Sequence, residues 1–429
     1  MGKKIEKIGV TNSYREDFRY SKRSLVWSSQ IKSEQVNREV NVSGFGFGPT
    51  SSGDDFTTKA AMLSVEALRQ SSRKFLSDSS TSDLPVGKVD LEAMSQALNI
   101  ANTWLDSATI FPATDQGTDI AWTRRQWLDA SIPGWQKMVE PLADGMAGAL
   151  GAVVTDMGVQ GFLPIMRGFM GSLIATQLGQ SIGALAMKVT GSNDVALPLF
   201  DNYGAHLVPQ NIAQWGEGID VPAQEIAIFL ALREAASSRL FIHTPWLSEY
   251  IQRAMTEYGK GIKIDVASIQ SQAERAMNSG ELDINNPESI NIAINQGMFM
   301  PEQSVEQGLA LEKLEMALAL IEGWIDHVVG VAANDLLPSL SALQETLRRA
   351  RVTNSPTQQL FATLLGLEVS PRKMRECAKF WSELFLIGGV QLRDHRWEDS
   401  SLLPTSDDLG DAEKFLRSTT VPDDLSGLL

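Results

Sequence analysis

The chain has 429 residues, of which 43% are hydrophobic and 21% are charged. This composition is typical of a globular protein with a sizeable core in one large or two medium domains, and it argues against general disorder. The formal net charge of −15 argues against nucleic acid as a partner, because binding to phosphates depends on basic residues. A single cysteine, Cys377, excludes an intrachain disulfide framework and a cysteine-based zinc site, and it fits a reducing cytoplasm.

The first 55 residues differ from the rest of the chain. Residues 1–40 carry nine Lys and Arg against five Asp and Glu, and residues 43–55 form a linker rich in Gly, Ser and Pro. The basic arm lacks the apolar core of a signal peptide. We interpret it as a mobile tail or an extended translation start, with contact to an anionic surface as the alternative.

Helical spacing of apolar residues begins after this linker. It predicts one helix over 56–76 and another that starts at Asp90 and carries LEAMSQALNIANTWL. A tryptophan-rich region follows. Aromatic side chains at such intervals bury large areas, so we expect a core rather than a ligand cage from these four residues: Trp104, Trp122, Trp127 and Trp135.

Twenty residues, 168–187, contain no charge, which is the length that spans a bilayer. Two glutamines lie in the middle of this segment, and Arg167 and Lys188 close it. Its small residues recur on one helical face, and such faces allow two helix backbones to approach closely. We therefore predict a buried central helix in a protein that is not transmembrane.

Residues 191–225 are the most loop-like part of the chain and contain His206. The following stretch, 226–250, has the spacing of one helix, but Arg233 and Ser237 fall on its apolar face. A buried guanidinium without a partner would cost roughly several kcal/mol. The sequence therefore predicts a negative group, from the chain or from a ligand, opposite Arg233.

Three runs of sequence carry a resemblance to a known family. They are LVPQNIAQWGEGIDVPAQEIAIFLALREAASSRLFIHTPWL at 207–247, EYGKGIKID at 257–265 and LALIEGWIDHVV at 318–329. These runs resemble an actinobacterial family of zincin-like, zinc-dependent metalloproteases, also labelled hydrolases. The resemblance covers about residues 91–403, and GFGFG near the start of the chain also fits.

The resemblance implies a His-Glu-x-x-His motif on a helix. Histidines at i and i+4 hold the zinc from one face, and the glutamate between them activates the bound water. In this sequence the three positions are Arg233, Glu234 and Ser237. Only the glutamate is kept, because Arg233 is a fixed cation and Ser237 is a weak ligand.

The resemblance also implies a third zinc ligand on a later helix, and Glu322 is the candidate. The helix expected over 304–333 has a clear apolar stripe, which Glu322 flanks, with Asp326 four residues further on. A solvated acidic face is one interpretation. The other is that Glu322 or Asp326 pairs with Arg233, so that a salt bridge occupies the position of the metal.

The histidines offer a further alternative. His243 follows Glu234 by nine residues, next to Thr244-Pro245, where a loop could fold back. His206 lies in the preceding loop. A rebuilt site from His206, His243 and Glu322 is therefore conceivable, although each histidine alone is more typical of a surface or a satisfied core position.

The remaining sequence predicts helices over 338–352, 355–367 and 371–390, with Cys377 as a buried, inert thiol. The helical body is expected to span 56–403, followed by an acidic C-terminal tail at 404–429.

These features together predict a mainly α, multi-helix zincin-like fold with little or no β-sheet, located in the cytoplasm. Two functions stay open. One is a zinc-dependent, peptidase-like metallohydrolase with Glu234 as general base and Glu322 as metal ligand. The other is a catalytically inactive binding or scaffold protein. In both, the partner is an unidentified peptide or protein.

Overall fold

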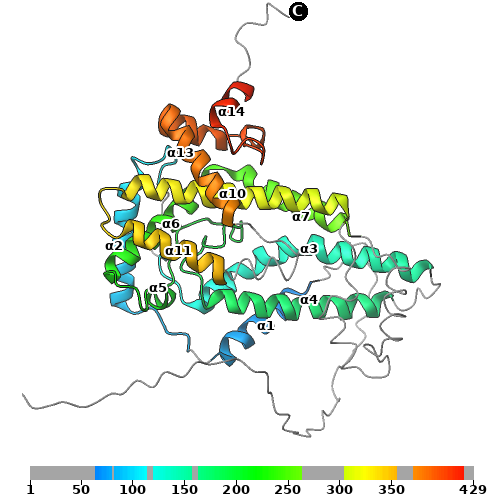
Figure 1. Cartoon of the computed structure of the whole chain (residues 1–429). Helices are drawn as coiled ribbons and strands as arrows, with labels where there is room; N and C mark the ends of the chain where they lie inside the picture. Colours follow the sequence, from blue (N-terminus) through cyan, green and yellow to red (C-terminus); the bar gives the residue numbers. More distant parts are fainter. Residues whose placement is uncertain are drawn as a thin grey trace, which may run out of the picture. The chain divides into compact units, whose positions relative to one another are not determined.

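The computed structural model describes residues 63–79, 82–113, 119–156, 163–262, 304–354 and 371–419 (Figure 1). The chain divides into two units, Met1–Thr58 and Lys59–Leu429, and every described residue belongs to the second. Predictions for residues 1–55 and 355–367 lie outside the described residues.

The described residues form helices and no strands, so the expected mainly α fold is confirmed. Two isolated β-bridges, both to Leu207, tie loops together. The helices in chain order are α1 (Val65–Asp78), α2 (Lys88–Leu105), α3 (Arg124–Asp156), α4 (Leu163–Ala186), α5 (Pro209–Trp215), α6 (Ala223–His243), α7 (Pro245–Lys260), α10 (Val305–Ala333), α11 (Leu340–Asn354), α13 (Pro371–Asp394) and α14 (Ala412–Thr419), with 3-10 turns at His395–Trp397 and Ser400–Leu402.

Helix α6 lies in the core and is buried on every side from Ile226 to Phe241. A helix covered all round must place its polar residues against partners within the protein. Arg239 shows the principle, because its guanidinium crosses to α2 and contacts the Asp106 carboxylate at 2.8 Å. The polar residues of α6 therefore point into the protein because the helix has no face exposed to solvent between Ile226 and Phe241.

Helix α10 runs beside α6, α7 and α13 (Figure 1). It begins at a capping box, in which the Ser304 hydroxyl accepts from the Gln307 amide and the Gln307 side chain accepts from the Ser304 amide. Among the described residues it is the one helix long and apolar enough to cross a membrane, but 72% of its apolar window is buried inside the protein. Its apolar surface thus has protein partners.

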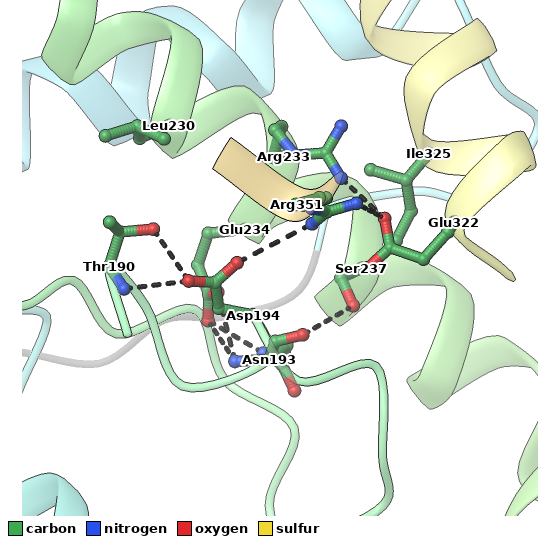
Figure 2. A pocket seen from close by; sticks show the side chains of 10 residues that line it. All are labelled: Thr190, Asn193, Asp194, Leu230, Arg233, Glu234, Ser237, Glu322, Ile325 and Arg351. Carbon is green, nitrogen blue, oxygen red and sulfur yellow. Dashed lines mark hydrogen bonds and ion pairs between the residues drawn. The ribbon is translucent and has the colours of Figure 1, made fainter. Parts of the chain in front are cut away.

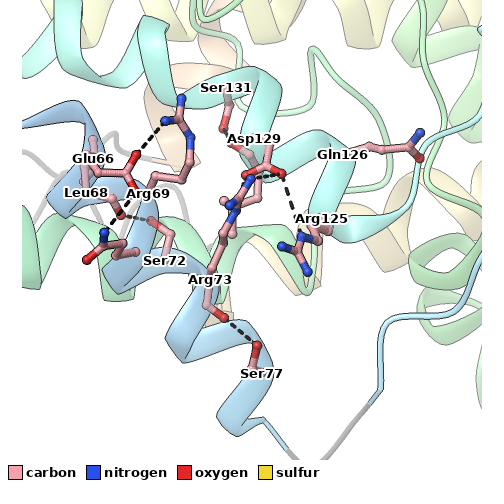
Figure 3. A network of polar contacts seen from close by, with 12 residues as sticks. Glu66, Leu68, Arg69, Ser72, Arg73, Ser77, Arg125, Gln126, Asp129 and Ser131 are labelled. Carbon is pink, nitrogen blue, oxygen red and sulfur yellow. Dashed lines mark hydrogen bonds and ion pairs between the residues drawn. The ribbon is translucent and has the colours of Figure 1, made fainter.

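The small face of α4 packs on α1. A Cβ atom at Gly179 would lie 2.6 Å from the Ser71 Cβ, and one at Gly183 would lie 2.8 Å from the Phe75 ring. Helix α1 is also tied to α3, because Arg73 donates two hydrogen bonds of 2.7 Å to the Asp129 carboxylate (Figure 3). The close approach expected from the small residues is therefore confirmed.

The expectation of a buried central helix over 168–187 is wrong in part. Helix α4 buries only the face that meets α1 and α3, and its polar residues Ser172, Thr176, Gln177 and Gln180 are exposed. The central positions belong to α6 and α10. The absence of charge does not distinguish a half-exposed helix from a buried one when Ser, Thr and Gln supply the polar face.

The stretch 226–250 contains two helices, with the break at Thr244-Pro245, where the sequence suggested that the chain could fold back; His243, expected beyond the helix, is the last residue of the first one. Helix α6 ends at His243, where the Thr244 amide still donates to the Leu240 carbonyl at 3.0 Å. Pro245 then begins α7, since proline lacks the amide that a continuing helix needs and suits a first turn. The break gives α7 its own direction, against α3 and α10.

The core includes the predicted tryptophans and cysteine. Trp122, Trp127 and Trp135 are buried, and Trp104 packs against the core while partly buried. Burial raises the pKa of the Cys377 thiol to about 12, which keeps it protonated and inert.

The acidic stretch expected as a tail from residue 404 contains α14. Phe415 on that helix stacks edge-on against Phe380 of α13, with ring centroids 5.3 Å apart. Leu409 and Ala412 are buried as well. The packed body therefore continues to the end of α14, because apolar residues are spaced among the acidic ones.

Helices α3 and α7 interlock through glycines. A Cβ atom at Gly145 would lie 2.0 Å from the Gly259 carbonyl oxygen, and one at Gly259 would lie 2.2 Å from the Pro141 carbonyl oxygen. Neither backbone can move aside without separating the two helices.

We expect Gly145→Ala to lower the free energy of unfolding by about 1–3 kcal/mol, because overpacking forces the helices apart. Gly148 is a matched control on the same helix, since a Cβ atom there meets nothing within 4 Å. Gly148→Ala should raise the free energy of unfolding by about 0.5–1 kcal/mol through helix propensity. Urea unfolding measures both, and equal effects would contradict the interlock.

Candidate functional site

The candidate site lies where α6, α10 and α11 meet the loop that follows α4. A cavity of about 10 Å³ occupies the centre, which is room for about one water molecule. Figure 2 shows side chains from all four segments converging on this point: Thr190, Asn193, Asp194, Leu230, Arg233, Glu234, Ser237, Glu322, Ile325 and Arg351.

Arg233 and Glu322 form a direct ion pair between α6 and α10. The distance from Arg233 Nη2 to Glu322 Oε2 is 2.7 Å, with side chains only 8% and 13% exposed. The other end of the guanidinium, Nη1, lies 3.6 Å from Asp326 Oδ1. The structure thus brings together the residues of the ion-pair hypothesis, with both carboxylates facing the cation.

A second arginine, Arg351 of α11, contacts the same carboxylate. Its Nη1 atom donates to Glu322 Oε2, and its Nη2 atom lies 3.8 Å from Asp194 Oδ1. Burial alone would raise the pKa of Glu322, but the guanidiniums of Arg351 and Arg233 hold that pKa below its ordinary value. Glu322 is therefore ionised and shared between two cations.

Glu234 points to the loop side of the cavity, and its Oε1 atom accepts from several donors, whereas Oε2 shares the Asn193 amide at 3.0 Å. Its carboxylate accepts hydrogen bonds from the Ser192 hydroxyl, the Asn193 amide at 3.0 Å, the Asn193 side-chain amide at 2.8 Å and the His206 amide at 3.4 Å. The backbone comes very close, since a Cβ atom at Gly191 would lie 2.2 Å from Glu234 Oε2. Only glycine fits there.

The loop can surround Glu234 because its two arms pair with each other. The Ser192 amide donates to the His206 carbonyl and the Val208 amide to the Thr190 carbonyl, each at 2.9 Å. The result is the antiparallel bridge between Gly191 and Leu207. This pairing aims the donors of Ser192, Asn193 and His206 at one point.

Burial raises the pKa of Glu234 to about 7, against the lowering effect of the hydrogen bonds from Ser192 and Asn193. The side chain is 4% exposed. A carboxyl group with this pKa changes its protonation near neutral pH, in the range where a general base is effective. The four donor groups of Ser192, Asn193 and His206 favour the ionised form, whereas the nearby Asp194 carboxylate raises the pKa further.

Ser237 is buried on the same face of α6 as Arg233, as its spacing in the helix predicted. Its hydroxyl reaches only the Asn193 carbonyl, at a long 3.5 Å. It thus lies at the edge of the cavity and makes no ion contact.

The histidines do not join this site. His206 stacks on Trp122 with centroids 3.8 Å apart, and its Nδ1 atom contacts the Asp119 carbonyl. His243 is exposed at the end of α6, where it stacks on Phe111 and its Nε2–H donates to the Pro112 carbonyl at 3.2 Å. Each ring is held by its own aromatic neighbour.

The residues present do not fit a zinc ion. Zinc needs neutral imidazoles or carboxylates at about 2.0–2.2 Å, and one oxygen of Glu322, Oε2, already contacts two guanidiniums. Arg233 stands at the first histidine position and repels a dication. Within the described ranges, no three His, Cys, Asp or Glu side chains are grouped to hold a metal.

Sequence reasoning missed Arg351, Asp194 and the donors of the loop. The signal for Arg351 was the cluster RRAR at 348–351 in an acidic chain. Asp194 and Asn193 carried no signal, because their loop has no periodicity and its fold depends on pairing with residues fourteen or more positions away.

In the described part of the chain the core is helical, and Glu322 of α10 faces Arg233 of α6, with Ser237 one turn further along α6 at the same cavity. The family described as zincin-like metallopeptidase matches residues 65–416, and the chain belongs to that family. The predicted family is thereby confirmed, whereas actinobacterial origin stays a prediction.

Among solved structures, the chain is similar to a protein from Chloroflexus aurantiacus that is provisionally described as a hydrolase with a novel fold. The TM-score is 0.56 at 17% sequence identity, over 83% of this chain and 98% of that chain. At this identity the similarity concerns the fold alone. Comparison with curated protein sequences gives no match.

We expect Glu322→Gln to lower the free energy of unfolding by about 3–5 kcal/mol, because it leaves two buried guanidiniums without their shared carboxylate. Glu345→Gln is the control, since Glu345 forms exposed pairs on the outer face of α11. It should leave the free energy of unfolding almost unchanged, because exposed ion pairs are screened by solvent. Urea unfolding at pH 7 compares them, and a Glu322→Gln variant as stable as the control would refute the buried network.

Glu234 should make stability fall with rising pH. Its pKa is raised from the ordinary glutamate value of 4.5 to about 7, so the folded state keeps a proton that the unfolded chain has lost. The contribution is complete below about pH 4.5 and is lost as the pH rises through 7, a change of about 3 kcal/mol at most. Unfolding between pH 5 and 8 should show this slope in the wild type and a smaller one in Glu234→Gln. Identical slopes would contradict the raised pKa.

Proposed function

We propose that this chain is a zincin-like protein in which an ion-pair network takes the place of the catalytic zinc, and that it binds a peptide or protein without hydrolysing it. The family as a whole suggests a metallohydrolase. The observation that supports the departure is the shared carboxylate of Glu322, which lies 2.7 Å from Arg233 and also contacts Arg351.

The electrostatics of the site support this proposal. A zinc ion on Glu322 Oε2 would have to displace both guanidiniums, and it would then face two uncompensated cations in a poorly solvated place. Arg233 cannot lose its charge to become a ligand, because a guanidinium stays protonated in proteins. The same residues that satisfy one another therefore disfavour the metal.

The position of Glu234 supports the proposal as well. A general base must accept a proton from water, but this carboxylate already accepts from Ser192, Asn193 and the His206 amide. The adjoining cavity, about 10 Å³, has room for about one water molecule and none for a peptide bond. Glu234 acts here as the anchor of the loop.

The second candidate is the metallohydrolase, with Glu234 as general base and zinc held in part by Glu322. One observation favours it: the pKa of Glu234 is raised to about 7, close to the pH at which a base works best. The lost histidines would then need replacement by other ligands.

The partner class and location follow from composition and are part of the proposal. An acidic chain with a net charge of −15 suits a peptide or protein partner rather than nucleic acid. A cytoplasmic location suits its single buried thiol.

We expect protein purified without chelator to contain far less than one zinc per chain, as measured by inductively coupled plasma mass spectrometry. The triple variant Arg233→His, Ser237→His and Arg351→Gln restores two imidazoles and frees Glu322, so it should take up about one zinc per chain. Adding Glu322→Gln should abolish that uptake. Stoichiometric zinc in the wild type would contradict the proposal.

Hydrolysis separates the two candidates directly. Wild type and Glu234→Gln are incubated with a fluorogenic peptide library with added zinc, and their stability is measured in parallel. We expect no turnover by either protein. Turnover by the wild type that falls at least about 100-fold in Glu234→Gln, with folding retained, would establish the enzyme.

A further inference from the structure

Two further cavities continue outward from the candidate site, between α10, α11 and α13. The inner cavity measures about 60 Å³ and shares Glu322 and Arg351 with the site. The outer one measures about 630 Å³ and shares Asp326, Arg348 and Ala378 with the inner one. Together they form a groove, here called the α10–α13 groove, that ends beside the ion-pair network.

The inner cavity has apolar walls and cationic edges. Leu347 of α11 and Met374 and Ala378 of α13 line it, together with Arg348 and Arg375. Its volume of about 60 Å³ exceeds what a single water molecule needs, so it can accept a small apolar side chain. The outer cavity falls within the range of roughly 300–1,000 Å³ that is usual for ligand sites.

The charges along the groove favour an anion. Its cationic lining residues are Arg348, Arg351, Arg375 and Lys379, against Glu322 and Asp326. Both carboxylates are already engaged, Glu322 by two guanidiniums and Asp326 by Arg233 at 3.6 Å. Three of the four cations have partners as well, since Arg351 pairs with Glu322, Arg348 with Glu345 at 3.4 Å and Lys379 with Glu383 at 3.3 Å. Arg375 is the lining cation without an ion pair among the described residues.

The guanidinium groups of Arg375 and Arg348 are exposed enough to donate hydrogen bonds to a ligand. Arg375 is exposed and forms no ion pair among the described residues. Arg348 lies 4.0 Å from Asp326 and 3.4 Å from Glu345, and its side chain is 44% exposed. A guanidinium binds a carboxylate through two parallel hydrogen bonds, which makes arginine suited to recognising that group.

We propose that the α10–α13 groove binds the C-terminal end of a peptide, with an apolar last side chain in the inner cavity and the terminal carboxylate on Arg348 and Arg375. The peptide backbone then lies in the outer cavity, where Gln344 and Ser382 supply polar groups. This inference rests on the proposed function, since it names the ligand of a protein that binds without cleaving.

The test uses two probes that differ only in the terminal charge, N-acetyl-leucyl-leucine and its C-terminal amide. Binding to the full chain is measured at pH 7 by isothermal titration calorimetry and by protein-observed NMR, at concentrations up to about 10 mM. We expect the acid to bind at least about tenfold more tightly than the amide, because only the acid forms the charge-assisted bonds.

Variants locate the site. Arg375→Gln should remove most of the preference for the acid. Arg372→Gln is the matched control, since Arg372 is exposed on the same helix, pairs with Glu376 at 2.8 Å and does not line either cavity. Ala378→Met should weaken the acid and the amide alike, because it fills the inner cavity.

Three results would overturn the inference: equal binding of acid and amide, no binding of either probe, or an acid preference that survives Arg375→Gln combined with Arg348→Gln. Cleavage of longer peptides by the same preparation is a separate outcome. It would refute the proposed function and leave an acid preference in the groove standing.

Discussion

The carboxylate of Glu322, shared between Arg233 and Arg351, is the interaction on which the centre of this structure depends. It joins three helices, α6, α10 and α11, through one buried anion. A single carboxylate between two guanidiniums leaves a positive excess, which Asp326 and Asp194 offset from either side. Charge balance therefore organises the point at which α6, α10 and α11 meet. The attraction between these charges offsets the free-energy cost of their desolvation only while every partner is present.

Glu234 shows how a motif residue can be kept for a different physical reason. In a metallopeptidase it would polarise water, whereas here its oxygens collect donors from the loop that follows α4. That loop has no regular structure of its own, so it needs an internal anchor to satisfy its buried amides. The small cavity beside Glu234 and the wider groove beyond Asp326 are two distinct spaces within one region, and the first is the more enclosed by buried side chains.

Most of the fold could be predicted from the sequence, because long periodic segments such as 304–333 fix a helix and its buried face together. The inward direction of Arg233 followed from the helical periodicity of residues 226–250. The need for a negative partner followed from the free-energy cost of burying an unpaired cation. The partner Arg351 could not be predicted, since its place depends on how α11 crosses α6. The exposed face of α4 and the packing of α14 were missed for related reasons. Composition records how apolar a segment is, and only tertiary contacts decide which side is covered.

The interlocking of these charges also constrains how the site could change in evolution. Arg233→His alone would leave Glu322 bound to Arg351 and would still lack the second imidazole at Ser237. Each single step towards a zinc ligand set breaks a buried contact before any metal affinity exists to compensate for it. Substitutions at Arg233, Glu322 and Arg351 should therefore be non-additive, because the three side chains share one contact network. Arg233, Glu322 and Arg351 can therefore be replaced only together if no buried charge is to lose its partner.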